Sequence, residues 1–239
     1  MSGFLHINGL SIYYEEHGSG EPLILLHGNG EDSTIFAEQI AFLAPHFRII
    51  TIDSRGHGQS SAPDENLRYE SMTDDVIKAM DLLQIDKFSV IGFSDGGILA
   101  LLLAICVPER IDRMIVIGAN YHPSGLKIIT RVFISLCYII YSLLYYLGFF
   151  SKKWRWKQQL MALMLRHPHI PENMLQSITA KTLLLVGDND IIRLAHTEKL
   201  LKLIKNAELL VLNDCDHFVL TRQAASFNEI ALKFLNKSL

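Results

Sequence analysis

The segment Gly92-Phe93-Ser94-Asp95-Gly96 lies between an apolar run at residues 88–92 and a helical pattern that begins at Ser94. A G-x-S-x-G segment between strand and helix is typical of a nucleophile elbow, a sharp turn that lifts the serine hydroxyl above the edge of a sheet. We therefore expect Ser94 to be a nucleophile, and the N–H of Asp95 to be free to donate to an oxyanion. The alternative is an ordinary turn, because two glycines in five residues also recur by chance.

Short apolar runs alternate with helical patterns along most of the chain. The runs predict strands at residues 10–15, 22–26, 47–53, 88–92, 113–118, 182–187 and 209–212. The helical patterns cover residues 69–84, 94–106 and 194–205, and a last helix is expected at about 222–237. This alternation predicts an α/β fold with a mostly parallel sheet and helices on both faces. Such sheets place their ligands at the carboxyl ends of the strands.

Residues 120–180 interrupt the alternation, because no convincing strand occurs there. We expect a helical cap at 120–180, inserted into a core domain made of residues 1–119 and 181–239. Within the cap, residues 132–150 form a run of 19 residues without a formal charge. Such a run is long enough to cross a bilayer. A basic cluster interleaved with two tryptophans follows it: Lys152, Lys153, Trp154, Arg155, Trp156 and Lys157.

More polar residues recur within this apolar run at spacings of 4, 3, 4 and 3: Arg131, Ser135, Tyr138, Ser142 and Tyr145. This spacing is typical of one face of an amphipathic helix. A membrane span between two strands of one sheet would also separate those strands. We therefore expect a cap helix whose apolar face covers Ser94 and selects hydrophobic acyl chains. Contact of the cap with a membrane surface is the alternative.

Two further strand ends carry the partners that a serine nucleophile needs. Asp188 and Asp190 follow the run at 182–187, and His217 follows the run at 209–212. Serine, then acid, then histidine is the chain order that this elbow architecture requires. We predict His217 as the general base, oriented by Asp188 or Asp190. Taken alone, His217 would more simply be a surface or core histidine.

A glycine-rich turn, His27-Gly28-Asn29-Gly30, follows the run at 22–26. Its glycines let the backbone approach a substrate closely, and the Asn29 N–H is the expected second oxyanion donor. With Asp53 at the next strand end, residues 28–33 also resemble a dinucleotide-binding fingerprint. That alternative is disfavoured because Ser33 replaces the third glycine and because it gives Ser94 no role.

Composition excludes several classes of protein. The 239 residues are 49% hydrophobic and hold 22 Lys and Arg against 25 Asp and Glu, so no basic excess points to nucleic acid. Three cysteines without a C-x-x-C pair favour a reducing compartment. Residues 1–10 lack the pattern of a signal peptide, so we expect a cytoplasmic protein. His122, His167 and His169 lack the further ligands of a metal set, so no metal is expected.

Five segments together resemble the α/β-hydrolase superfamily: LHGNG (26–30), DSRGHGQS (53–60), GFSDGG (92–97), LLLVGDND (183–190) and CDHF (215–218). The resemblance implies Ser94 as nucleophile and His217 as base. It implies Asp190, rather than Asp188, as the acid. It also implies that the main-chain N–H groups of Asn29 and Asp95 form the oxyanion hole, and that Asp53, Arg55, His57 and Ser60 are structural. No cofactor is implied.

The resemblance implies a serine hydrolase, most simply a carboxylesterase that cleaves a small-molecule ester with a small or medium apolar acyl group. A carbon–carbon bond hydrolase, a thioesterase, an amidase or an acyltransferase would keep the same three residues. A non-catalytic, ligand-binding scaffold is an alternative of a different class, because fold does not fix function. No oligomeric state is predicted.

Overall fold

The computed structural model describes residues 1–148 and 151–236, so residues 149–150 of the predicted cap and 237–239 of the predicted core domain lie outside the described residues. Eight strands form one sheet in the order β1-β2-β4-β3-β5-β6-β7-β8. They are β1 (Ser2–Ile7), β2 (Leu10–His17), β3 (Glu21–Leu26), β4 (Phe47–Ile52), β5 (Phe88–Phe93), β6 (Ile111–Ile117), β7 (Lys181–Gly187) and β8 (Ala207–Leu212). β1 and β2 are antiparallel to their neighbours, and the other six are parallel. The predicted α/β fold is thus confirmed.

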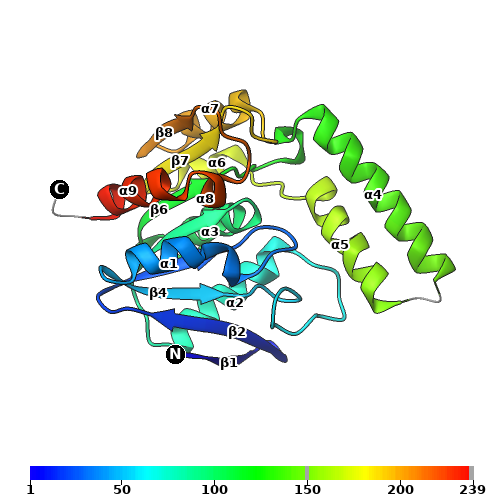
Figure 1. The fold of residues 1–239 in the computed structure, drawn as a ribbon, viewed down its shortest axis with the longest axis horizontal. Helices are drawn as coiled ribbons and strands as arrows, with labels where there is room; N and C mark the ends of the chain where they lie inside the picture. The colour runs from blue at the N-terminus through cyan, green and yellow to red at the C-terminus, as the bar shows by residue number, and fades with distance from the viewer. Residues whose placement is uncertain (149–150, 237–239) are drawn as a thin grey trace.

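Helices cover both faces of the sheet (Figure 1). One face packs against α2 (Tyr69–Leu82), α3 (Asp95–Cys106) and α7 (Leu194–Leu203), and the other against α1 (Ala37–Leu43), α8 (Val219–Arg222) and α9 (Ala224–Leu235). The central strands are buried on both sides, and for this reason runs such as LILL in β3 are apolar throughout.

The register of the sheet brings the ends of five strands to one edge. Leu26 lies beside Gly92, Phe93 beside Ile117, Ile117 beside Leu185, and Gly187 beside Leu212. The loops that carry Ser94, Asp190 and His217 all leave the sheet at this edge.

Three elements differ from the sequence-based expectation. β1 and α1 were not predicted. Residues 2–7 form an edge strand in which exposed and half-buried side chains alternate, and this leaves no apolar run to detect. The expected last helix is divided into α8 and α9, with Gln223 between them in a non-helical conformation.

The segment between β6 and β7 contains α4 (Ile128–Leu147), α5 (Lys152–Arg166) and α6 (Glu172–Gln176). Figure 1 shows α4 and α5 as an antiparallel hairpin that reaches away from the sheet, with α4 on the outside. The inner helix α5 buries Leu160 and Leu163, and its Trp156 ring lies edge-on to His57 with the ring centroids 4.9 Å apart.

The expected orientation of α4 was wrong. Its polar edge faces α5, where Gln158 Nε2 donates to Ser142 Oγ at 2.9 Å and Arg166 Nη2 donates to the Tyr138 hydroxyl at 2.9 Å. Its apolar face points outward, so that Leu136 and Leu143 are more than half exposed. The physical reason is that α5 already occupies the place next to the core and supplies polar partners for α4.

Candidate active site

Ser94 lies in a sharp turn between β5 and α3, with a φ of +53° that a residue with a side chain rarely adopts. A Cβ on Gly92 would lie 2.2 Å from the Gly96 oxygen, and a Cβ on Gly96 would lie 1.9 Å from the Leu26 oxygen. Both positions therefore require glycine, because neighbouring backbone atoms occupy the space that a Cβ would need. The Ser94 N–H donates to the Ile117 oxygen at 2.8 Å and anchors the turn to β6.

A chain of hydrogen bonds links Ser94, His217 and Asp190. His217 Nε2 lies 3.0 Å from Ser94 Oγ, and His217 Nδ1 lies 2.9 Å from Asp190 Oδ1. Asp190 is completely buried, and its Oδ1 also accepts the Ile192 N–H at 2.8 Å. A carboxylate at Nδ1 favours the tautomer in which Nε2 accepts the serine proton. The structure thus brings the three predicted residues together in the geometry that nucleophilic catalysis needs.

Asp188 has a different environment. Its two carboxylate oxygens accept the N–H groups of Cys215 and Asp214, each at 3.0 Å, and these bonds lower the pKa of Asp188. Asp188 therefore fixes the loop that carries His217, whereas Asp190 contacts the imidazole itself. This geometry distinguishes two carboxylates that the residue pattern alone left open.

The predicted oxyanion donors lie on the two loops that flank the serine. A Cβ on Gly28 would lie 3.2 Å from Ser94 Cβ, so the turn that carries Asn29 touches the nucleophile. Across the described residues, the main-chain N–H groups of Asn29 and Asp95 donate to no protein acceptor. Asn29 Nδ2 donates to Asp95 Oδ2 at 2.9 Å and ties the two loops together. Both N–H groups remain available for an oxyanion.

Asp95 also borders a small cavity of about 10 Å³ at Ser94. Its Oδ1 accepts the Tyr69 hydroxyl at 2.8 Å, and burial raises the pKa of Asp95. The lining of the cavity includes the polar residues Tyr69, Ser94, Asp95 and Asn120 and the apolar residues Leu126, Met164, Ile191 and Ile192. Drug-sized ligands commonly occupy pockets of about 300–1,000 Å³. The space at Ser94 is far smaller, so it identifies the residues that surround the nucleophile and does not define the size of a substrate.

Glu31 is a residue of this site that the sequence reasoning missed. Its Oε2 accepts the Gly28 N–H at 3.0 Å, beside the point where Gly28 approaches Ser94. Burial raises the pKa of Glu31 to about 7, although this hydrogen bond and the nearby His217 act in the opposite direction. The detectable signal was the three-residue spacing from Gly28 to Glu31, which is closed into a turn by the Glu31 N–H bond to the Gly28 oxygen.

The segment at 53–60 makes structural contacts. Arg55 pairs with Asp75 of α2 through Nε and Nη2, at 2.6 and 2.7 Å. His57 packs against Trp156 of α5, and burial lowers the pKa of His57 to about 3. These contacts connect the loop after β4 to α2 and α5.

Metal-binding geometry is absent from the described residues, in which no group of three or more His, Cys, Asp or Glu side chains could hold an ion. The rings of His122 and His169 lie in contact, with centroids 4.8 Å apart, and the rings of His167 and His169 are 6.2 Å apart.

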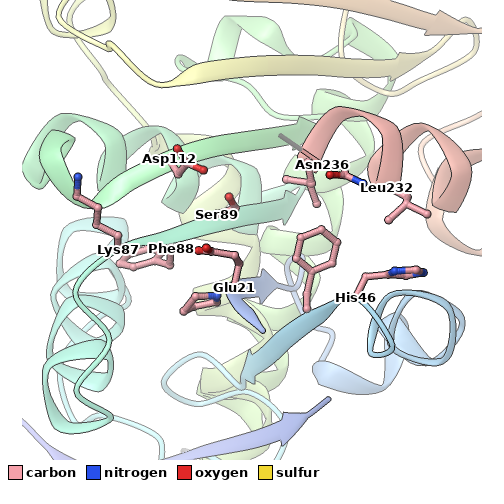
Figure 2. A pocket seen from close by; sticks show the side chains of 11 residues that line it. Glu21, His46, Lys87, Phe88, Ser89, Asp112, Leu232 and Asn236 are labelled. Carbon is pink, nitrogen blue, oxygen red and sulfur yellow. The ribbon is translucent and has the colours of Figure 1, made fainter. Parts of the chain in front are cut away.

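A larger pocket, of about 570 Å³, lies at the opposite edge of the sheet (Figure 2). Glu21, Phe47 and Phe88 line it, and these are the first residues of β3, β4 and β5. The pocket is thus separated from Ser94 by the length of the strands.

Fold and site together consist of a mostly parallel sheet and a serine on a strand-to-helix turn, hydrogen-bonded to a histidine. Residues 21–134 match the family model described as alpha/beta hydrolase fold. The mouse serine hydrolase BPHL is 28% identical, over 96% of this chain and 84% of that protein. The (E)-2-((N-methylformamido)methylene)succinate hydrolase of Acinetobacter baylyi is 30% identical, over 48% of this chain and 43% of that enzyme.

Solved structures agree on the fold. An esterase from Exiguobacterium antarcticum superimposes with a TM-score of 0.84 at 22% identity, over 98% of this chain and 99% of that one. The chain thus has the α/β-hydrolase fold, and residues 21–134 match the family model, in agreement with its sequence motifs.

Proposed function

We propose that this protein is a serine hydrolase that cleaves a carboxylic ester with a small or medium apolar acyl group. The observation that carries the proposal is the hydrogen-bonded series from Ser94 through His217 to Asp190. Similarity to the serine hydrolase BPHL and to the Exiguobacterium esterase supports this class of reaction.

The mechanism follows from the positions of the side chains. Ser94 Oγ attacks the ester carbonyl while His217 Nε2 takes its proton, and Asp190 stabilises the imidazolium that forms. The N–H groups of Asn29 and Asp95 donate to the tetrahedral oxyanion. His217 then protonates the leaving alcohol, and an acyl group remains on Ser94. A water molecule, deprotonated by His217, attacks this acyl-enzyme and releases the carboxylic acid.

The apolar side chains beside Ser94 support the substrate class. Leu126, Met164, Ile191 and Ile192 line the cavity at Ser94, and Asp95 adds a carboxyl group to the same lining. Apolar burial contributes about 0.8 kcal/mol per methylene, so each carbon added to the acyl chain should raise kcat/KM up to about fourfold until these side chains are covered. A larger side chain in this lining, as in Met164→Trp, should shorten the preferred acyl chain.

The test combines covalent labelling with a series of activated esters of increasing acyl length. A fluorophosphonate should label wild-type protein on Ser94, and Ser94→Ala should remove the label and lower kcat at least about 10³-fold. Ser226→Ala, on the exposed surface of α9, is the matched control. Undiminished labelling of Ser94→Ala would refute the proposal. Labelling without turnover of esters would favour a thioester, an amide or a carbon–carbon bond as substrate.

A further inference from the structure

The outward face of α4 is an unusual concentration of exposed apolar side chains. Of the 16 large apolar side chains that are exposed among the described residues, ten lie on α4. They recur at three- and four-residue spacing and form one face, which we name the α4 outer face: Ile128, Ile129, Val132, Phe133, Leu136, Ile139, Ile140, Leu143, Tyr146 and Leu147. At 1.5 Å per residue the face is about 30 Å long, which is far larger than the scattered apolar contacts normal on a monomer.

Charge is segregated onto the same hairpin. Residues 120–171 contain seven of the 22 Lys and Arg residues and none of the 25 Asp and Glu residues. Within the described chain, none of these seven pairs with a carboxylate. The hairpin is therefore a cationic, apolar projection on a protein whose remaining residues carry a net negative charge, with 15 Lys and Arg against 25 Asp and Glu. This combination is typical of segments that bind anionic lipid headgroups.

Aromatic side chains lie beside these charges, where α4 ends and α5 begins. The rings of Tyr141 and Trp154 stack with their centroids 6.1 Å apart. The ammonium groups of Lys153 and Lys157 lie 5.4 and 5.5 Å from the centre of the Trp154 ring. Tryptophan and tyrosine favour the headgroup region of a bilayer, because they combine an apolar ring with a polar edge.

Two other roles fit the hairpin less well. α4 is apolar and long enough to cross a bilayer, but it follows β6, and the chain returns to β7, which pairs with β6 in the same sheet. If α4 crossed a bilayer, the chain would have to return to the sheet through α5, which carries Lys152 and Lys153 in its first turn. Pairing of two copies through the α4 outer face would bring two cationic hairpins together, and their like charges would repel.

We propose that the α4 outer face docks this protein on the surface of a membrane that contains anionic lipids. α4 lies in the plane of the interface, with Leu136 and Leu143 among the acyl chains and Lys152 and Lys153 at the headgroups. The inner helix α5 stays on the protein, where Leu160 and Leu163 are buried. Docking places the site at Ser94, whose cavity is bordered by Met164 of α5, next to the lipid surface.

The test is co-sedimentation of the full chain with phosphatidylcholine vesicles, prepared with and without phosphatidylserine. Binding should require phosphatidylserine and should weaken as salt rises. Leu136→Glu with Leu143→Glu should reduce vesicle affinity at least about tenfold, because a charge is placed in the apolar layer. Lys152→Gln with Lys153→Gln should reduce it about 25-fold, at about fivefold per lysine near an anionic surface.

The matched controls have the same types of substitution at positions outside the hairpin. Leu82→Glu alters an exposed leucine of α2, and Lys202→Gln with Lys205→Gln removes two exposed charges at the end of α7. These controls should bind vesicles like wild type, and urea unfolding should show that every variant is folded. The readout does not require hydrolysis, so it stands apart from the proposed esterase activity.

Three outcomes would overturn the proposal. The first is no binding to phosphatidylserine vesicles at low salt. The second is unchanged binding by both hairpin variants. The third is a stable dimer in sedimentation equilibrium that Leu136→Glu dissociates, since the α4 outer face would then be a contact between copies of the chain.

Discussion

His217 Nε2 lies 3.0 Å from Ser94 Oγ, although the two residues are 123 positions apart in the sequence. The parallel register of β5, β6, β7 and β8 accounts for this proximity, because the loops after β5 and β8 leave the same edge of the sheet. Substitution of the residues that hold these two side chains in place should therefore lower the rate of hydrolysis.

The environment of the two carboxylates after β7 predicts unequal effects. Asp190→Asn should lower kcat about 10⁴-fold, since an amide at this position favours the wrong imidazole tautomer. Asp188→Asn should keep kcat within about tenfold of wild type, because Asp188 holds backbone N–H groups and not the imidazole. Steady-state kinetics on one activated ester compares the two. A greater loss in Asp188→Asn would show that the acid has been misassigned.

Gly118 controls the position of the histidine. It has a φ of +55°, and a Cβ there would lie 2.8 Å from the His217 ring and 3.0 Å from Asp190 Oδ2. Gly118→Ala should therefore lower kcat/KM at least about 10²-fold, since displacement of a catalytic group by about 1 Å costs that much.

Gly9→Ala is the control for Gly118→Ala, because it introduces backbone strain at a positive φ without a steric clash. Gly9 has a φ of +76°, and nothing lies within 4 Å of its Cβ position. We expect Gly9→Ala to lose about 1–2 kcal/mol of stability in urea unfolding and to keep wild-type kcat/KM. Equal loss of activity in both variants would contradict a specific contact of Gly118 with His217.

Burial of Glu31 makes stability depend on pH. The pKa of Glu31 is raised from 4.5 to about 7, so the native protein keeps a proton there that the unfolded chain has already lost. The contribution of this proton to the free energy of unfolding is fully present below pH 4.5. It is lost as the pH rises through 7, a decrease of up to about 3 kcal/mol. Glu31→Gln has no such proton to lose.

The free energy of unfolding of wild type should therefore fall relative to that of Glu31→Gln as the pH rises from 5 to 8. The raised pKa of Glu31 sets this range. Urea unfolding at intervals of pH measures this difference. The matched control is Glu38→Gln, on the exposed surface of α1, which should change stability by less than about 0.5 kcal/mol. A difference between Glu31→Gln and wild type that is constant with pH would contradict the raised pKa.

Asp95 should disfavour anionic acyl groups, because its carboxyl group borders the cavity at Ser94. Asp95→Asn removes this charge, so kcat/KM for a hemisuccinate ester should rise relative to that for a neutral ester of the same length. At an effective dielectric constant of about 20, repulsion over several ångströms is worth at least about tenfold in this ratio. Use of the ratio corrects for activity lost through the Tyr69 and Asn29 hydrogen bonds. An unchanged ratio would show that Asp95 takes no part in selecting the substrate.

Local sequence by itself determined the parallel core and the serine elbow. Apolar runs predict strands covered on both faces, and Gly92 and Gly96 are required by contacts within the turn and with the end of β3. The positions of Ser94 and His217 at strand ends were likewise predictable, because parallel strands place their carboxyl ends at one edge. β1 was missed because an edge strand with one exposed face has no apolar run.

Only the tertiary structure decided which face of α4 points to solvent, which aspartate contacts His217, and that Glu31 is partly buried. Periodicity divides a helix into two faces, but α5 determines which of them is covered, through contacts such as Gln158 with Ser142. Asp188 and Asp190 have the same chemistry, and their roles depend on bonds to residues more than 20 positions away. The raised pKa of Glu31 results from burial, a property of the packed loops around Gly28 and not of the residue itself.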